Sequence, residues 1–202
     1  MKKTVLTGMA LGLALAAAAP TVAMAGEGAA NVTLTSNYLW RGMTQTADAA
    51  ALQGGYDYDF GNNFSLGTWA STVAAGVEYD IYGSYAANSG DLGYSVGFIY
   101  YGYTDATFSA PFTEPVVGLS YKDFGFNYYI GDGYNYTELS YGTAVSGVDL
   151  GLTYGMNAPA VGTGTNHMIL SVSKDFSGYG VSLTYSDVSS VTGIALGVTK
   201  EF

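Results

Sequence analysis

Carboxylates recur in this chain at every second position of short segments. Asp57 and Asp59 form one such pair, Glu78 and Asp80 form another, and Glu114 and Glu138 occupy the same polar phase of later segments. Residues two apart in a β-strand point to the same face. Carboxylates gathered on one face around a narrow aqueous channel favour cations and disfavour anions. The pattern therefore indicates electrostatic selection of small solutes.

Arg41 is the basic residue that the same alternation places on this polar face. An arginine that faces several acids across a narrow lumen is expected to pair with one of them and to set a constriction. A different use of the same residues stays open, because small barrels also fill their interiors with hydrogen-bonded polar side chains that conduct nothing. Strand number separates the two, since about eight strands give a filled interior and about sixteen an open one.

Catalytic and metal-binding motifs are scarce. His167 is the sole histidine, and the chain has no cysteine, so it offers no zinc motif, nor does it contain an Asp-x-Asp-x-Asp-Gly calcium loop. Alternation alone brings no particular serine to His167 as a catalytic pair would require. We therefore expect no enzyme, no metal and no cofactor, and keep a hydrolase at the loop rim as a less favoured alternative.

The segments that position these residues alternate in hydrophobicity with a period of two from end to end. Residues 148–156, for example, place valine, leucine, tyrosine and methionine on one face, and aspartate, glycine and threonine on the other. The first such segment is predicted to run past Tyr38 and Trp40 to Arg41. Tight turns alternate with longer polar stretches near 43–49, 104–113 and 157–165. The count is about twelve strands of roughly ten residues.

This organisation predicts an all-β fold, a transmembrane antiparallel up-and-down β-barrel of about twelve strands with both termini on the periplasmic side. Aromatic residues at the strand ends fit two interfacial girdles, with Tyr38, Trp40 and Tyr136 among those expected at the loop side. A soluble β-sandwich is the alternative fold. It is less favoured because twelve apolar faces would leave almost no charged surface, whereas a closed barrel satisfies every backbone group in lipid.

The N-terminal 25 residues have the features of a signal peptide. Lys2 and Lys3 precede an apolar run, and Ala23-Met24-Ala25 supplies a small-x-small cleavage site. Residues 26–202 would then form one outer-membrane barrel domain. That part holds 16 acidic residues against four basic ones, a formal charge of −12. Nucleic acid is an unsuitable partner for such a chain.

A Lys-acid-Phe sequence ends three segments, at Phe124, Phe176 and Phe202, with spacings of 52 and 26 residues. Each phenylalanine is expected to close a strand at the tight-turn side, where the neighbouring lysine can extend toward headgroups. The terminal Phe202 also resembles the C-terminal signal by which the barrel-assembly machinery recognises its clients. We therefore expect outer-membrane lipid and this machinery as partners.

The segments NVTLTSNYLWRGMTQT and ALQGGYDYDF follow the cleavage site. They resemble the opening of the TorF family of proposed porins, in which Asn-Val-x-Leu-Thr-Ser-x-Tyr leads into Arg-Gly-x-Thr-Gln-Thr. The positions that match are Asn31, Val32, Leu34, Thr35, Ser36 and Tyr38, then Arg41, Gly42, Thr44, Gln45 and Thr46. VEYDIYGSY and VSKDF also resemble that family. The resemblance implies an outer-membrane β-barrel with a pore role and implies no particular substrate.

Together these observations predict a porin-like channel in the bacterial outer membrane, reached after Sec export. Its expected solutes are small, polar, and cationic or neutral, and its expected lumen residues are Arg41, Asp57, Asp59, Glu78, Asp80, Glu114 and Glu138. A non-conducting structural or adhesive barrel that acts through its loops is the second hypothesis.

Overall fold

A computed structural model of the chain describes residues 26–202, so the predicted signal peptide lies outside the described residues. Within them, twelve strands form one closed antiparallel barrel and two short strands form a separate hairpin. The barrel strands are β1 (Glu27–Thr35), β4 (Ala51–Asp59), β5 (Phe64–Thr72), β6 (Val77–Ser89), β7 (Leu92–Tyr103), β8 (Phe112–Tyr121), β9 (Phe124–Gly131), β10 (Tyr134–Val145), β11 (Val148–Pro159), β12 (Thr165–Asp175), β13 (Tyr179–Val188) and β14 (Val191–Glu201). The short hairpin consists of β2 (Leu39–Trp40) and β3 (Met43–Thr44).

The first and last strands close the barrel. β1 pairs with β14 on one side and with β4 on the other, so no barrel strand keeps an unpaired edge. The start of β1 and the end of β14 lie at the end of the barrel that carries the tight turns. The turn between β10 and β11 is typical, because Ser146 and Gly147 both have positive φ, as a two-residue type I′ turn requires. The predicted fold class and strand number are confirmed.

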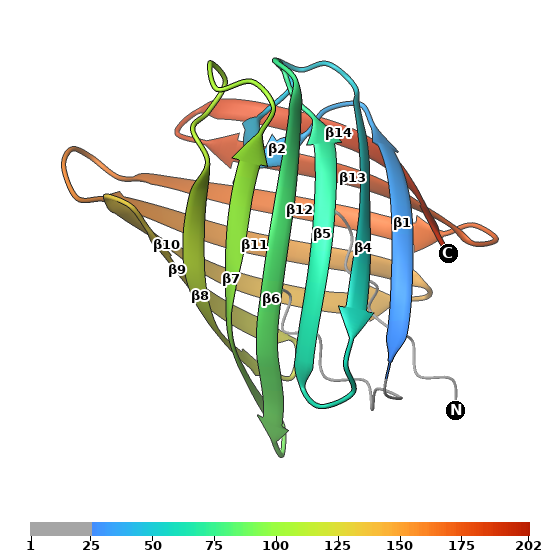
Figure 1. Cartoon of the computed structure of the whole chain (residues 1–202). Coiled ribbons are helices and arrows are strands. Elements are labelled where there is room, and N and C mark those ends of the chain that lie inside the picture. The colour runs from blue at the N-terminus through green and yellow to red at the C-terminus, as the bar shows by residue number, and fades with distance from the viewer. Residues whose placement is uncertain (1–25) are drawn as a thin grey trace.

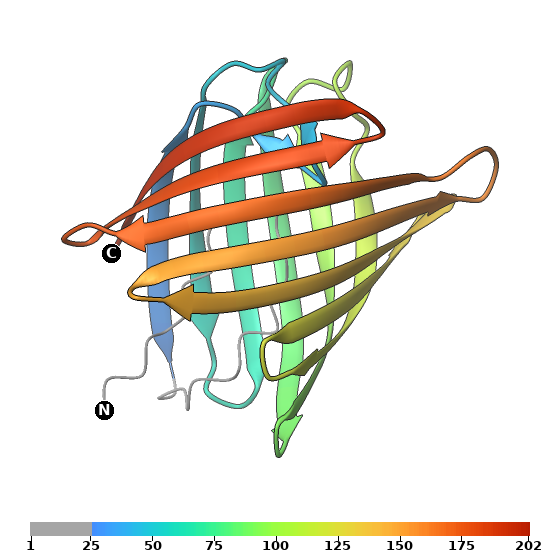
Figure 2. The ribbon, with the colours of Figure 1, turned by 180° about the vertical axis from the view of Figure 1, so that it is seen from behind.

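The barrel is flattened into two faces. β1 and β4–β8 run steeply along one face, and β9–β14 cross behind them at a large angle (Figures 1 and 2). The longer connections, which include residues 36–50, 104–111 and 160–164, gather at the end opposite the tight turns. This is the predicted division between a loop end and a turn end.

Side chains that point out of the barrel are apolar and exposed, as a lipid-facing surface requires. Leu34 is 60% exposed on β1, and Ile194 is 62% exposed on β14. A soluble sandwich would bury such residues. The part of the chain that the structure describes has no helix long and apolar enough to cross a membrane.

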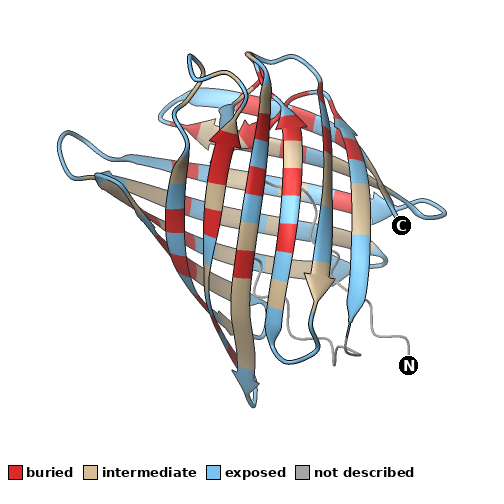
Figure 3. Cartoon of the chain, in the orientation of Figure 1, coloured by how far each residue is buried: buried red, intermediate tan, exposed pale blue. Residues whose placement is uncertain are grey.

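The inward face changes character along the barrel axis. Toward the turn end, small residues face one another across neighbouring strands, as in the pairs Ser95–Gly118 and Ser173–Ser182. Toward the loop end, the inward residues include large aromatic and acidic side chains that are buried, and buried positions concentrate in the upper part of the strands of the front face in Figure 3. The packed half of the lumen therefore lies under the loops.

Candidate functional site

The segment between β1 and β4 enters the lumen and builds the candidate site. Thr35 at the end of β1 is directly paired with Ala51 at the start of β4. The strands thus meet where they end, and residues 36–50 are an excursion from an otherwise simple hairpin. We call this excursion the lumen hairpin. Its residues Tyr38 and Leu39 are only 3% and 7% exposed.

A tight turn points Arg41 into the barrel. Trp40 on β2 pairs with Met43 on β3, which leaves Arg41 and Gly42 as the two turn residues. Their φ angles are 48° and 80°, the positive values of a type I′ turn. Asn37 stabilises the base of the hairpin, since its side-chain oxygen accepts hydrogen bonds from the hydroxyls of Thr44 and Thr46 at 2.7 and 3.0 Å.

Arg41 is held by a buried carboxylate and by aromatic rings. Its Nη2 atom lies 2.8 and 2.7 Å from the two carboxylate oxygens of Glu114 on β8, and Glu114 is fully buried. The guanidinium carbon lies 3.8 Å from the ring centroid of Tyr136 and 4.4 Å from that of Trp40. Charge-assisted hydrogen bonds and cation–π contacts are both stronger away from water.

Glu114 also accepts hydrogen bonds from the hydroxyls of two tyrosines, Tyr101 at 3.0 Å and Tyr134 at 2.5 Å. Three donors therefore satisfy this carboxylate, as a buried charge requires.

The opposite side of the turn rests on β13. The carbonyl oxygen of Gly42 accepts a hydrogen bond from the hydroxyl of Ser186 at 2.8 Å. A Cβ atom at Gly42 would lie 2.7 Å from a methyl carbon of Val188. β8 and β13 are five places apart in the order of the twelve strands. The lumen hairpin therefore spans nearly the full width of the barrel.

Of the remaining predicted lumen acids, Glu78, Asp80 and Glu138 lie in the loop half with the hairpin. Glu78 accepts a hydrogen bond from the hydroxyl of Tyr38 at 3.2 Å. Glu138 accepts hydrogen bonds from Asn127 at 3.3 Å and from the hydroxyl of Tyr136 at 3.2 Å. Neither oxygen of Asp80 has a hydrogen-bond partner among the described residues.

The last two predicted acids, Asp57 and Asp59, lie in the turn half. Asp57 accepts a hydrogen bond from the hydroxyl of Tyr82 at 2.6 Å, and Asp59 accepts one from the backbone N–H of Gly61 at 2.6 Å. The structure thus pairs Arg41 with Glu114, gathers Glu78, Asp80 and Glu138 near that pair, and leaves Asp57 and Asp59 apart from it.

Three expectations for the first strand and the aromatic girdle are wrong. The strand ends at Thr35 and does not continue to Arg41. Tyr38 and Trp40, expected in the loop-side girdle, are instead inside the barrel, where Trp40 packs edge-on against Tyr101 with ring centroids 6.1 Å apart. Tyr136, also expected in the girdle, is 1% exposed and belongs to the lumen. The sequence signal for the hairpin was the Arg-Gly pair that directly follows the apolar Tyr38-Leu39-Trp40.

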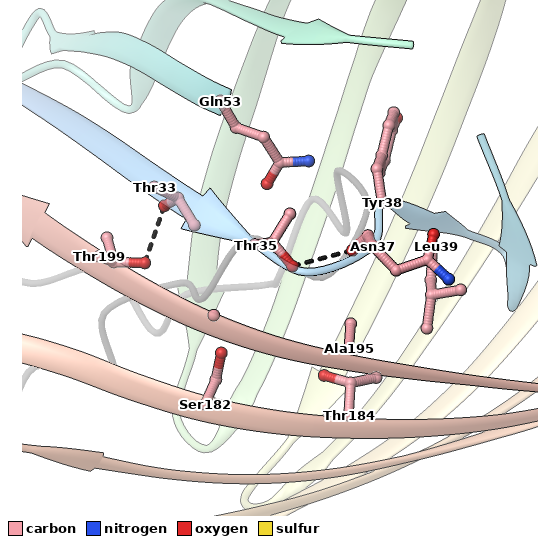
Figure 4. A pocket seen from close by; sticks show the side chains of 11 residues that line it. Thr33, Thr35, Asn37, Tyr38, Leu39, Gln53, Ser182, Thr184, Ala195 and Thr199 are labelled. Atoms are coloured by element: carbon pink, nitrogen blue, oxygen red, sulfur yellow. Dashed lines mark hydrogen bonds between the residues drawn. The ribbon is translucent and has the colours of Figure 1, made fainter. Parts of the chain in front are cut away.

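A small polar cavity lies beside the hairpin. Its volume is about 30 Å³, room for about two water molecules. Asn37, Tyr38 and Leu39 border it on the hairpin side, and hydroxyl-bearing residues of β1, β13 and β14 line the wall (Figure 4). This cavity therefore has room for water alone.

His167 is bonded to a tyrosine of the lumen. The Nε2 atom of His167 shares a hydrogen bond of 3.0 Å with the hydroxyl of Tyr136, and the two rings stack. Among residues 26–202, no group of three or more His, Cys, Asp or Glu side chains is arranged to hold a metal ion.

Known structures share this barrel at low sequence identity. A structure described as KdgM porin is 14% identical, with a TM-score of 0.64 over 86% of this chain and 99% of that chain. A KdgM porin in complex with disordered oligogalacturonate is 13% identical, with a TM-score of 0.63 over 87% and 99%. The NanC porin is 9% identical, with a TM-score of 0.60 over 86% and 98%. These similarities establish a porin-type fold.

No curated protein sequence matches the chain. A family model described as "Bacterial protein of unknown function (Gcw_chp)" matches residues 18–190, which is most of the chain. The protein therefore belongs to the Gcw_chp family of bacterial proteins and has the twelve-stranded barrel fold of porins.

Proposed function

We propose that this protein is an outer-membrane channel for the passive diffusion of small polar solutes. Its cargo would be cationic or neutral, and the lumen hairpin would form its constriction. The observation that carries the proposal is the charge balance around the hairpin. Arg41 is already neutralised by Glu114. Glu78, Asp80 and Glu138 lie in the same half of the lumen, and no cationic side chain in the described part of the chain is bonded to them.

The charged residues at the loop end of the barrel also favour the entry of cations. Asp48, Asp105 and Asp132 lie in the connections at the loop end, and Lys122, Lys174 and Lys200 all lie at the turn end. Hydrogen bonds from the hydroxyl and the backbone N–H of Thr107 lower the pKa of Asp105, which favours the charged form of this acid. A rim of one charge sign raises the local concentration of ions of the opposite sign.

The oligogalacturonate named for one similar structure is a polyanion. An acidic lumen such as this one would repel it, so we do not extend that solute to this protein. The porin fold and the opening segment that resembles the TorF family both support a pore role. We also propose that the predicted acidic residues and Arg41 line this pore and that the protein is related to the TorF family. Sec export, location in the outer membrane and recognition of Phe202 by the barrel-assembly machinery also belong to the proposal.

Purified, folded protein in a planar bilayer tests the proposal. We expect discrete conductance steps and, in a salt gradient, a reversal potential of the sign that marks cation preference. Glu138→Gln should reduce that potential because it removes a lumen charge, whereas Asp123→Asn, which removes a charge in a tight turn at the barrel end, should leave it unchanged. Folded barrels that never conduct would refute the channel.

A second function, a non-conducting barrel that acts through its loops, is favoured by the close packing of the loop half and the small cavity beside the hairpin. It predicts that removing the hairpin produces a conductance that the native protein lacks. The hydrolase alternative loses support because His167 bonds a tyrosine hydroxyl. Replacing His167 and assaying esterase activity in detergent would test it.

A further inference from the structure

Two carboxylates under the lumen hairpin have no counter-charge among residues 26–202. Glu78 and Asp80 lie two residues apart on β6 and point into the barrel, where they are 2% and 0% exposed. Burying an ionised carboxylate is costly unless hydrogen bonds or an opposite charge compensate it. Glu78 receives one hydrogen bond, from Tyr38. Asp80 receives none from any described residue.

Arg41, the basic side chain of the lumen, does not serve this pair. Both of its short contacts go to Glu114 on β8. Five residues donate hydrogen bonds to Glu114 or Glu138, and none of the described residues donates one to Asp80. The acids of this lumen therefore divide into partnered and unpartnered ones. An unpartnered buried acceptor in a solute pathway points to a ligand that donates hydrogen bonds and carries positive charge.

Aromatic rings surround these two carboxylates. The register places Trp69 of β5 and Tyr101 of β7 directly opposite Asp80 on its two sides, and Tyr103 opposite Glu78. Directly opposed inward residues lie close enough for their side chains to touch. Tyr38 covers the group from the hairpin, and its ring packs edge-on against Trp69 with centroids 5.4 Å apart.

We propose that Glu78 and Asp80, enclosed by Tyr38, Trp69, Tyr101 and Tyr103, form a binding site for the primary ammonium group of a small organic amine. The inference rests on the proposed channel function and names the class of solute that this channel would pass. A primary ammonium brings one positive charge and three N–H donors to acceptors that have free capacity. The aromatic faces add cation–π attraction.

The Tyr38 side chain blocks access to this site. Because its hydroxyl occupies one oxygen of Glu78 and its ring closes over Trp69, an amine must displace it to reach Asp80. Tyr38 belongs to the lumen hairpin, so the segment that narrows the lumen also closes the amine site. Binding and opening are therefore linked, since an amine that requires the displaced Tyr38 stabilises the displaced state.

Calorimetry on the folded barrel in detergent tests the site without requiring conduction. Ethylammonium chloride is the probe, and uncharged propanol, of similar size, is its control. We expect ethylammonium to bind and to change the tryptophan fluorescence, since Trp69 lines the site, and we expect propanol not to bind. Asp80→Asn should weaken binding about tenfold or more, because it removes a charged acceptor. The matched control Asp123→Asn, which makes the same change in an exposed tight turn outside the lumen, should bind as the native protein does.

Equal affinity for ethylammonium and propanol, or equal affinity in the native protein and Asp80→Asn, would overturn the site. If Asp80→Asn fails to fold, Tyr38→Phe serves instead, because it frees an oxygen of Glu78 and should tighten binding. Unchanged or weaker binding in that variant contradicts the site. Ethylammonium binding in a barrel that never conducts would reject the channel and keep the site, whereas conduction without Asp80-dependent binding would reject the site alone.

Discussion

Removing Arg41 should release the lumen hairpin. In Arg41→Ala the buried Glu114 loses both short contacts to the guanidinium, and Tyr136 and Trp40 lose the cation that lies over their rings. Breaking a buried ion pair by removing one partner costs about 3–5 kcal/mol. Because Tyr101 and Tyr134 still donate to Glu114, we expect the lower end of that range.

A loss of about 3 kcal/mol changes the ratio of docked to released hairpin by a factor of about 150. Two measurements report this change. Single-channel recordings should show larger or more frequent openings. Amide hydrogen exchange at Ala74, whose N–H donates to the carbonyl of Gln45 in the docked hairpin, should accelerate by a similar factor, while amides of the barrel strands keep their protection.

The matched control is Lys122→Ala, which also removes one positive charge but at a tight turn. It should change neither measurement. The double variant Arg41→Met with Glu114→Gln should recover part of the docking, since no buried charge is then left without a partner. If Arg41→Ala conducts and exchanges like the native protein, the ion pair does not hold the hairpin and this reasoning fails.

Further predictions concern the contacts of the lumen hairpin with β13, the lipid-facing surface and assembly. Gly42→Ala should undock the hairpin, as seen by faster hydrogen exchange, because the position has positive φ and a Cβ there would meet Val188. Ser186→Ala should cost about 1 kcal/mol of docking because it removes the hydrogen bond to the Gly42 carbonyl; identical exchange rates would contradict this. Leu152→Arg, on the outer face of β11, should destabilise the folded barrel in lipid by about 2–4 kcal/mol in a urea titration. Deletion of Phe202 should lower the amount of protein assembled in the membrane more than it changes the conductance of the assembled fraction, and normal assembly would refute its role as a signal.

The alternation of the sequence predicted the barrel and the inward face, because each strand encodes its own two faces locally. Glu78 and Asp80 were placed on the polar face from their spacing alone, and the structure puts both inside. The same logic could not say how these acids are partnered. Arg41 and Glu114 are 73 residues apart, and the registers of the five strand pairings from β1 to β8 decide which acid the arginine meets.

The lumen hairpin was the main feature that alternation mispredicted. Tyr38 and Trp40 continue the apolar phase of β1, so a local pattern extends the strand through them. Their rings are buried by the aromatic wall of the lumen, with Trp69 and Tyr101 among their neighbours, and that wall exists only once distant strands have come together. A period of two cannot distinguish burial in lipid from burial inside the barrel.

The claim that the lumen hairpin is the constriction of a channel is tested most directly by removing it. Because Thr35 and Ala51 are already paired, residues 37–48 can be replaced by a short Gly-Ser linker without separating β1 from β4. We predict that the native protein conducts weakly with cation preference, and that the shortened protein conducts several-fold more with the same preference, since the wall acids remain. Equal conductance in the two proteins, measured in the same planar bilayers, would contradict the account.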